Sequence, residues 1–133
     1  MSDGHVDEHI RKMLEQRCCS RHTRTAEFSR KAPTDWRPQT VRNPSAPDQY
    51  FTEDSAWEFI AQALRDDAPI EIVTLERPPG KTGYVLLLRG YPPCGTIYVK
   101  LQLAASNVMG RSFHESYVVK HMEVLKNAKL ERD

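Results

Sequence analysis

The sequence lacks most of the features that would place a protein in a specialised class. Its 133 residues include three cysteines, Cys18, Cys19 and Cys94, without C-x-x-C or Cys/His spacing. A disulfide framework or a structural zinc site is therefore not indicated. No stretch approaches the roughly 18 consecutive apolar residues of a membrane span, and the first residues lack the basic-then-apolar pattern of a signal peptide. We expect a cytoplasmic protein with no membrane partner.

The motifs of common catalytic and nucleotide-binding sites are also missing. H-E-x-x-H, G-x-S-x-G and paired metal-ligand carboxylates do not occur. Residues 80–82, Gly-Lys-Thr, match the last three positions of the phosphate-binding loop motif G-x-x-x-x-G-K-[ST]. Leu75, however, occupies the position of its first glycine. The following residues 84–88 form an apolar run of strand length and do not open a helix. We therefore predict a hairpin loop here, and no cofactor or metal.

Net charge is only +1, but charge is distributed unevenly along the chain. Residues 17–42 carry seven Arg or Lys and two acids, residues 43–76 one base and eight acids, and residues 77–126 seven bases and two acids. The simplest interpretation of this charge distribution is an ordinary solvated surface. The alternative is that the two basic stretches converge on one polyanion such as a nucleic acid.

The first fifty residues predict a helix followed by a basic arm. Apolar positions recur at helical spacing over residues 6–19, with acids near the start. Residues 20–50 contain four prolines and few apolar residues, which argues against regular structure. Phe28 and Trp36 could anchor this arm on the core or stack on nucleic-acid bases. We assign residues 1–50 to the helix and arm, and residues 51–133 to a core domain.

The core domain is predicted to be α+β. Trp57, Ile60, Ala61 and Leu64 recur at helical spacing after a potential cap, Thr52. The apolar period then changes to two over residues 70–76, 82–89, 96–103 and 108–114, which are joined by short, turn-rich connections. Such connections favour a four-stranded antiparallel meander packed by helices. A second amphipathic helix is expected near residues 116–130.

One face of the predicted third strand, residues 96–103, is polar. Tyr98, Lys100 and Gln102 alternate with apolar residues, so all three should point the same way. A polar sheet face is often only the solvated side. These three, however, are large side chains that can all form hydrogen bonds, and we take them as site candidates.

The fourth predicted strand adds Arg111, Ser112 and His114 to the candidates, and Lys81 lies at the tip of the first hairpin. Regular alternation would send Arg111 and His114 to opposite faces. Only a bulge or bend would bring both into one cleft. Lys81, Arg111, Gln102 and Ser112 are the residues that we expect to bind substrate.

These residue types suit cleavage of RNA by its own 2′-hydroxyl. That reaction needs a base, an acid for the departing 5′-oxygen, and cations for the charge on the phosphate, without a metal. His114 could serve as acid or base because imidazole changes charge near neutral pH. Tyr98 could donate or position a proton, while Lys81, Lys100 and Arg111 could hold the phosphate. A purely structural role for His114 is the competing interpretation.

The segments TIYVKLQL, residues 96–103, and GRSFHES, residues 110–116, resemble a known family. A strand of the form [IV]-Y-[VIL]-K-[LI], then a turn and a strand ending S-F-[HK], is similar to the C-terminal half of the MqsR-like toxins. These belong to the RelE/ParE superfamily of bacterial toxin–antitoxin systems. The resemblance covers roughly residues 52–116. It implies a RelE-like fold with a curved antiparallel sheet, metal-independent mRNA cleavage and inhibition by a cognate antitoxin protein.

The resemblance also implies roles for individual residues. Tyr98 and Lys100 match the Y-x-K strand, and His114 matches the basic residue after Ser-Phe, where related toxins have lysine. These three are the predicted catalytic residues. Lys81 is a looser match to a basic residue ahead of that strand, and Gln102 has no counterpart in the motif.

A non-catalytic module is the alternative to a toxin endoribonuclease. It would bind RNA, DNA or a protein through the basic arm and the edge of the sheet. Its affinity for nucleic acid would fall steeply with salt and would survive loss of His114, because phosphate contacts act through counterion release.

Overall fold

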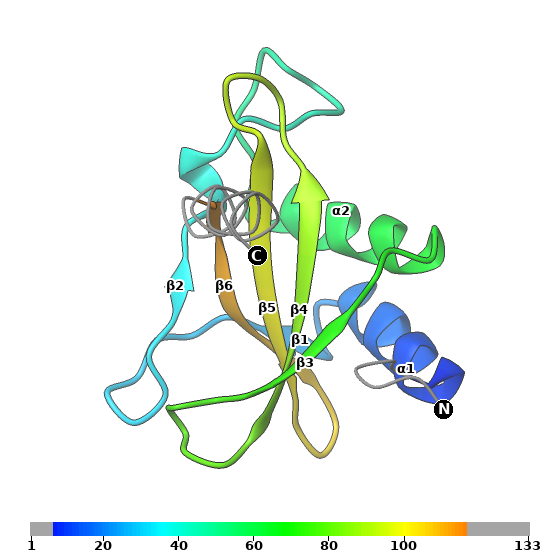
Figure 1. Ribbon diagram of the computed structural model, residues 1–133, viewed down its shortest axis with the longest axis vertical. Coiled ribbons are helices and arrows are strands. Elements are labelled where there is room, and N and C mark those ends of the chain that lie inside the picture. Colours follow the sequence, from blue (N-terminus) through cyan, green and yellow to red (C-terminus); the bar gives the residue numbers. More distant parts are fainter. Residues whose placement is uncertain (1–6, 117–133) are drawn as a thin grey trace, which may run out of the picture.

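Two α-helices and a six-stranded mixed sheet form the described part of the chain, residues 7–116, in the computed structural model (Figure 1). The helices are α1 (Glu8–Cys18) and α2 (Glu53–Arg65), with a short 3-10 helix η1 (Pro38–Thr40) between them. The strands are β1 (Arg24–Thr25), β2 (Asp35–Trp36), β3 (Glu71–Thr74), β4 (Thr82–Arg89), β5 (Thr96–Leu103) and β6 (Val108–Glu115). The predicted α+β class is confirmed.

Both helices begin at side-chain caps. The Asp7 carboxylate accepts a hydrogen bond from the Ile10 N–H at the start of α1. Thr52 and Ser55 form a reciprocal capping box at the start of α2, which supports the predicted role of Thr52. Neither helix is long and apolar enough to cross a membrane, within the residues described. The helix predicted near residues 116–130 lies almost entirely outside this part of the chain.

The four predicted strands are present as β3 to β6, and each pairs antiparallel with the next. Residues 75–81 connect β3 to β4 as a hairpin loop, so the Gly-Lys-Thr segment does not open a helix. Gly80 has φ +79, in the left-handed region that favours glycine. The glycine of this segment is thus explained by the turn and needs no phosphate.

The sheet is larger than predicted and not wholly antiparallel. β1 and β2 both run parallel to β6 and pair with it, Arg24 opposite Val108 and Asp35 opposite Ser112. The prediction of a four-stranded sheet was therefore wrong at this edge. Two-residue strands show no alternation that a sequence pattern could reveal, and the prolines around them favoured an irregular arm.

Trp36 fixes the arm to the rest of the molecule. Its ring lies 4.7 Å from that of Trp57 and 5.5 Å from that of Phe113, between ring centroids. Its indole N–H donates to Glu53 at 2.9 Å. Of the two interpretations of this aromatic residue, anchoring on the core is the one that the packing supports.

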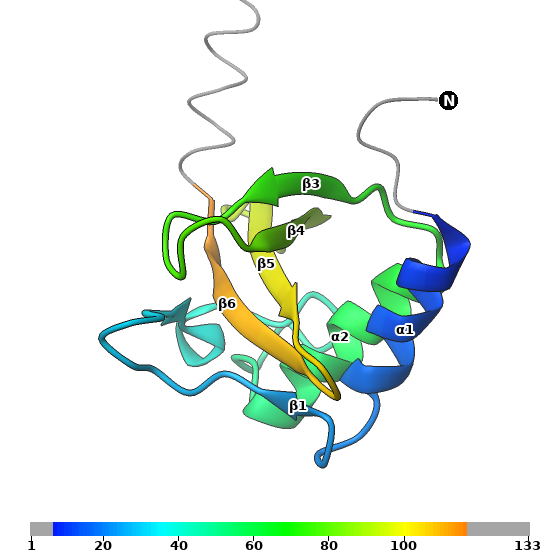
Figure 2. The same cartoon turned by 90° about the horizontal axis from the view of Figure 1, so that it is seen from below.

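The hydrophobic core lies between the sheet and the helices, which sit on the same side of β4–β6 (Figure 2). Residues before 51 contribute to this core as well. Leu14, Cys18 and Val41 are buried in the same cluster as Trp57 and Leu86. The helix and arm therefore pack with the residues that follow them, which leaves the opposite face of β5 and β6 for the polar side chains.

Candidate functional site

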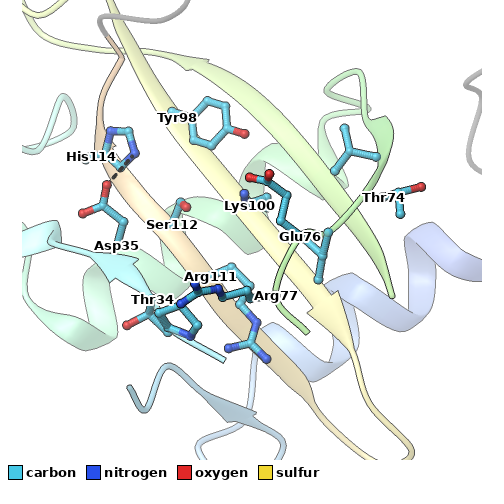
Figure 3. Close-up of a pocket in the computed structure, with 13 residues that line it drawn as sticks. Thr34, Asp35, Thr74, Glu76, Arg77, Tyr98, Lys100, Arg111, Ser112 and His114 are labelled. Carbon is cyan, nitrogen blue, oxygen red and sulfur yellow. Dashed lines mark ion pairs between the residues drawn. The ribbon is translucent and has the colours of Figure 1, made fainter. Parts of the chain in front are cut away.

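A hollow of about 770 Å³ opens on the face of the sheet turned away from the helices (Figure 3). It is bordered by the segment around β2, by β3 with the following hairpin loop, and by the middle of β5 and β6. The residues around it are Pro33, Thr34, Asp35, Val73, Thr74, Leu75, Glu76, Arg77, Tyr98, Lys100, Arg111, Ser112 and His114. It thus brings together segments from all three charge stretches, but no basic side chain of residues 17–42 is among those that line it.

A β-bulge in β6 explains how so many of the candidates share this hollow. Lys100 pairs with Ser112, whereas the next residue, Leu101, pairs with Gly110. Arg111 is therefore an extra residue on β6 without a partner on β5. Such a bulge locally interrupts the alternation of side chains. Arg111, Ser112 and His114 consequently line one hollow, which regular strand geometry would have prevented.

Arg111 is held by the protein itself. Its Nε and Nη2 donate to the Gln102 side-chain oxygen at 2.8 and 2.7 Å, and its Nη1 donates to the Ala32 carbonyl oxygen at 2.9 Å. The residue is only 3% exposed, and burial lowers the pKa of its guanidinium below the ordinary value. Arg111 can supply positive potential beneath the hollow, but most of its hydrogen-bonding capacity is already used.

Two residues predicted to bind substrate do not line the hollow. Gln102 is buried, and its amide oxygen is committed to Arg111. Lys81 is exposed near the end of the hairpin loop, where its carbonyl accepts from the Leu75 N–H at 2.7 Å. Gln102 therefore acts as a support for Arg111, and the side chain of Lys81 lies outside the cluster.

His114 is placed by contacts to both ring nitrogens. Nδ1 lies 2.7 Å from the Glu115 carbonyl oxygen, and Nε2 lies 3.3 Å from Asp35 Oδ2 (Figure 3). The ring stacks on Tyr98, with 5.4 Å between centroids and planes 18° apart. A carbonyl oxygen can only accept, so Nδ1 must donate and Nε2 is the nitrogen left for proton transfer. An imidazolium satisfies both contacts at once.

Tyr98 and Lys100 stand next to each other along the same face of β5. Both are partly buried and both line the hollow. Burial raises the pKa of the Tyr98 phenol, and the nearby Glu71 carboxylate adds to the effect. The hydroxyl therefore stays protonated at neutral pH and is suited to donating a hydrogen bond. The Lys100 ammonium is the cation on this face of β5.

Sequence analysis missed three charged residues of the hollow, Asp35, Glu76 and Arg77. Asp35 is brought to His114 by the parallel pairing of β2 with β6. Glu76 and Arg77 belong to the hairpin loop after β3. No pattern in the sequence indicated these three residues, because their approach to the hollow depends on strand pairing and on the path of the loop.

The cysteines do not contribute to this hollow. Cys18 and Cys94 are buried free thiols, and burial raises the pKa of each. Cys19 is exposed at the C-terminal end of α1, with Arg65 Nη2 3.8 Å from its sulfur. Among residues 7–116, no three His, Cys, Asp or Glu side chains are grouped so that they could hold a metal ion.

Comparisons with known proteins do not extend this description. A scan against protein-family models found no family that matches the chain. Searches among curated proteins and among solved structures likewise found no significant match. The function must therefore be inferred from the side chains around the hollow.

Proposed function

We propose that this protein is a metal-independent endoribonuclease, the toxin of a toxin–antitoxin system, which cleaves mRNA by attack of the 2′-hydroxyl on the adjacent phosphate. The observation that carries the proposal is the shared hollow of Tyr98, Lys100 and His114. These are also the residues for which the sequence resembles the MqsR-like toxins of the RelE/ParE superfamily. An acid-base residue, a neutral hydroxyl donor and a cation around one opening match the needs of this reaction.

His114 is assigned as the general acid. Its Nδ1 is occupied by the Glu115 carbonyl, so Nε2 would deliver the proton. Asp35 Oδ2, 3.3 Å from Nε2, orients the ring for this transfer. In the reaction the 2′-oxygen bonds to phosphorus, the bond to the 5′-oxygen breaks, and Nε2 protonates that leaving oxygen. The products are a 2′,3′-cyclic phosphate and a free 5′-hydroxyl.

The other groups of the hollow complete the reaction. Glu76 is a carboxylate on the same hollow and is assigned as the base that removes the 2′-hydroxyl proton. Lys100 would stabilise the charge that develops on the phosphate oxygens, and the protonated Tyr98 would donate a hydrogen bond to them. Arg111, held from beneath by Gln102, adds positive potential without leaving its partners.

The test is cleavage of a mixed-sequence RNA in EDTA by the purified full chain. We expect wild type to give 2′,3′-cyclic phosphate ends, and His114→Ala to be at least about 100-fold slower, the usual range for loss of an acid or base. Lys100→Ala and Tyr98→Phe should also lower the rate. An RNA with 2′-deoxyribose at the cleaved position should stay intact.

His9→Ala is the matched control, because His9 is exposed on α1 and does not line the hollow. It should retain wild-type activity. If wild type and His114→Ala leave the RNA equally intact, or if the deoxyribose-containing strand is cut at the same rate, the proposed reaction is wrong.

The binding-module alternative remains a second candidate because the arm carries exposed basic residues at Arg30 and Lys31. It predicts RNA binding that falls with salt, without cleavage, and that is unchanged in His114→Ala. The two functions therefore separate in a single comparison of binding and cleavage for that variant.

The proposed class implies a cognate antitoxin as partner. A neighbouring reading frame that encodes a small acidic or helix-turn-helix protein would support it. Co-expression of that protein should restore growth to cells that express wild type, whereas cells that express His114→Ala should grow without it.

A further inference from the structure

The seven cations of residues 17–42 are not equally available to a ligand. Five of them bind groups of the protein: Arg17 the carbonyls of Ala104 and Asn107, Arg21 and Arg24 the Asp54 carboxylate, Arg37 Asp35, and Arg42 the Pro47 carbonyl. Arg30 and Lys31 are exposed and have no hydrogen bond or ion pair in the described residues 7–116. The basic character of the arm that is open to a partner is thus concentrated at one point.

An exposed aromatic ring lies at the same point. Phe28 is 67% exposed, the highest value among the large apolar residues in the described part of the chain. Trp36, the other large aromatic residue of the arm, is anchored against Trp57 and Phe113. Of the two roles considered for these aromatic residues, anchoring on the core fits Trp36, and stacking on bases is left for Phe28. Trp36 anchors the arm, whereas Phe28 contributes little to the core.

The loop that carries Phe28 is fixed at both ends by pairing with β6, and its second end borders the hollow. It connects β1 to β2, both paired with β6, and it projects away from the sheet (Figures 1 and 2). The Ala32 carbonyl accepts from Arg111, and the next residue, Pro33, lines the hollow. Phe28 precedes Pro33 by five residues, so its Cα is within about 18 Å of the Pro33 Cα at the border of the hollow.

We propose that the loop tip, Phe28 with Arg30 and Lys31, is a second binding site for the RNA strand, where an unpaired base stacks on Phe28 while its phosphates contact the two cations. This inference rests on the proposed function for its choice of RNA. Aromatic rings among cations are the usual platform for single strands, because every base offers a π-face and every nucleotide a charge. Glu27 offsets part of the charge, so stacking carries much of the binding. The site therefore selects unpaired RNA.

The test separates stacking from charge by measuring affinity as a function of salt. A fluorescent single-stranded RNA about 12 nucleotides long is titrated by anisotropy with full-length protein in the His114→Ala background, which prevents cleavage. Phe28→Ala should weaken binding by about tenfold at every salt concentration, the loss expected for one stacked base. The double variant Arg30→Gln/Lys31→Gln should reduce the slope of log affinity against log salt by about 1.4, or 0.7 per contact on a single strand.

Tyr50→Ala is the control, since Tyr50 is also exposed, at 54%, but packs on Arg42 and does not line the hollow. It should bind RNA like the parent. A blunt RNA duplex of the same length should bind the parent more weakly than the single strand and should be insensitive to Phe28→Ala.

The possible results distinguish this inference from the proposed function. If wild type does not cleave RNA but the Phe28 and salt-slope effects are found, the RNA site stands and the enzyme is wrong. If wild type cleaves RNA while Phe28→Ala and the double variant bind like the parent, the loop-tip site is wrong and the enzyme stands. Equal binding of duplex and single strand, or an effect of these variants on a protein partner alone, would also overturn the site.

Discussion

Asp35 shows how one residue of the arm acts on the proposed site. Its Oδ2 lies 3.3 Å from His114 Nε2, and its Oδ1 lies 2.8 Å from Arg37 Nε. Arg37 contacts both carboxylate oxygens, because its Nη2 also donates to Oδ2 at 3.4 Å. It therefore holds the carboxylate in the orientation in which Oδ2 faces the imidazole. Asp35 is therefore a positioning residue, which contacts Nε2 of His114 and fixes the plane of its ring.

We predict that Asp35→Asn slows RNA cleavage on the order of tenfold, a part of the full contribution of a general acid, with little change in KM. The amide keeps the shape of the side chain but weakens the contacts by which the carboxylate orients His114 Nε2 and is itself held by Arg37. The measurement is kcat at neutral pH for ordinary RNA and for RNA with sulfur in place of the 5′-oxygen, since a thiolate leaves without an acid.

Cleavage of the sulfur-containing substrate distinguishes a role of Asp35 through the general acid from a general effect on the site. If Asp35 acts through the acid, Asp35→Asn should cleave that substrate at nearly the wild-type rate. Equal losses on both substrates would mean that the substitution disturbs the site in general, and the positioning role would be wrong.

At the scale of elements, the short strand β2 is kept in place by a glycine on its neighbour. A Cβ at Gly110 would lie 2.4 Å from the Trp36 ring, nearer than real Cβ atoms approach other groups. That ring is confined by Trp57 and Phe113, so it has little room to move. Gly110 thus allows Trp36 to lie on β6, and β2 carries Asp35 to His114.

We predict that Gly110→Ala lowers the free energy of unfolding by about 1–3 kcal/mol, the usual cost of overpacking, and lowers cleavage as β2 and Asp35 shift. Urea unfolding followed by the fluorescence of Trp36 and Trp57 measures the first effect. Gly95→Ala is the control, because no atom lies within 4 Å of the added Cβ, and it should change stability by no more than about 0.5 kcal/mol. Equal stability of the two variants would contradict the packing argument.

The elements that sequence could predict are those with a visible period. β4, β5 and β6 have eight residues each, and α2 has 13 with a capped start, so alternation and helical spacing were both readable. Tyr98, Lys100 and His114 could be placed on β5 and β6 for the same reason. β1 and β2 have two residues each and form only by pairing with a distant strand. Asp35, and the bulge that turns Arg111 into the hollow, depend on that tertiary pairing and left no pattern.

At the scale of the whole molecule, the sequence shows where charged residues lie along the chain. It does not show which of them are paired within the fold. Some charges of the basic and acidic stretches are paired with each other inside the protein. Asp54 from the acidic stretch binds Arg21 and Arg24 from the basic arm, and Glu15 from α1 binds Arg65. Two places stand out as open to a polyanion, the hollow with Lys100 and Arg77 and the loop tip with Arg30 and Lys31. Counting charges along the chain could predict that a convergence was possible, whereas its position required the fold.

At the scale of the whole molecule, burial also favours the neutral form of several thiol and phenol groups. Burial raises the pKa of Cys18, Cys94, Tyr84 and Tyr98 above their ordinary values. A group whose pKa is higher in the folded state contributes its full stability below the unfolded pKa and loses it as pH rises toward the folded one. The unfolded pKa is about 8.5 for cysteine and about 10 for tyrosine. The loss of stability should therefore begin when the two thiols ionise in the unfolded chain. It should become steeper when the two phenols ionise there as well.

We predict that the free energy of unfolding is nearly constant from about pH 7 to about pH 8 and then declines, by up to about 1.4 kcal/mol per pH unit for each fully raised group. Urea titrations under reducing conditions, at intervals up to about pH 10, measure the decline. Cys18→Ala removes the most deeply buried thiol, so it should be less stable than wild type at pH 7 but should lose stability less steeply above pH 9. Because the comparison is between slopes, the cavity left by the sulfur does not affect it. Parallel curves for wild type and Cys18→Ala would show that ionisation of Cys18 does not limit stability at alkaline pH.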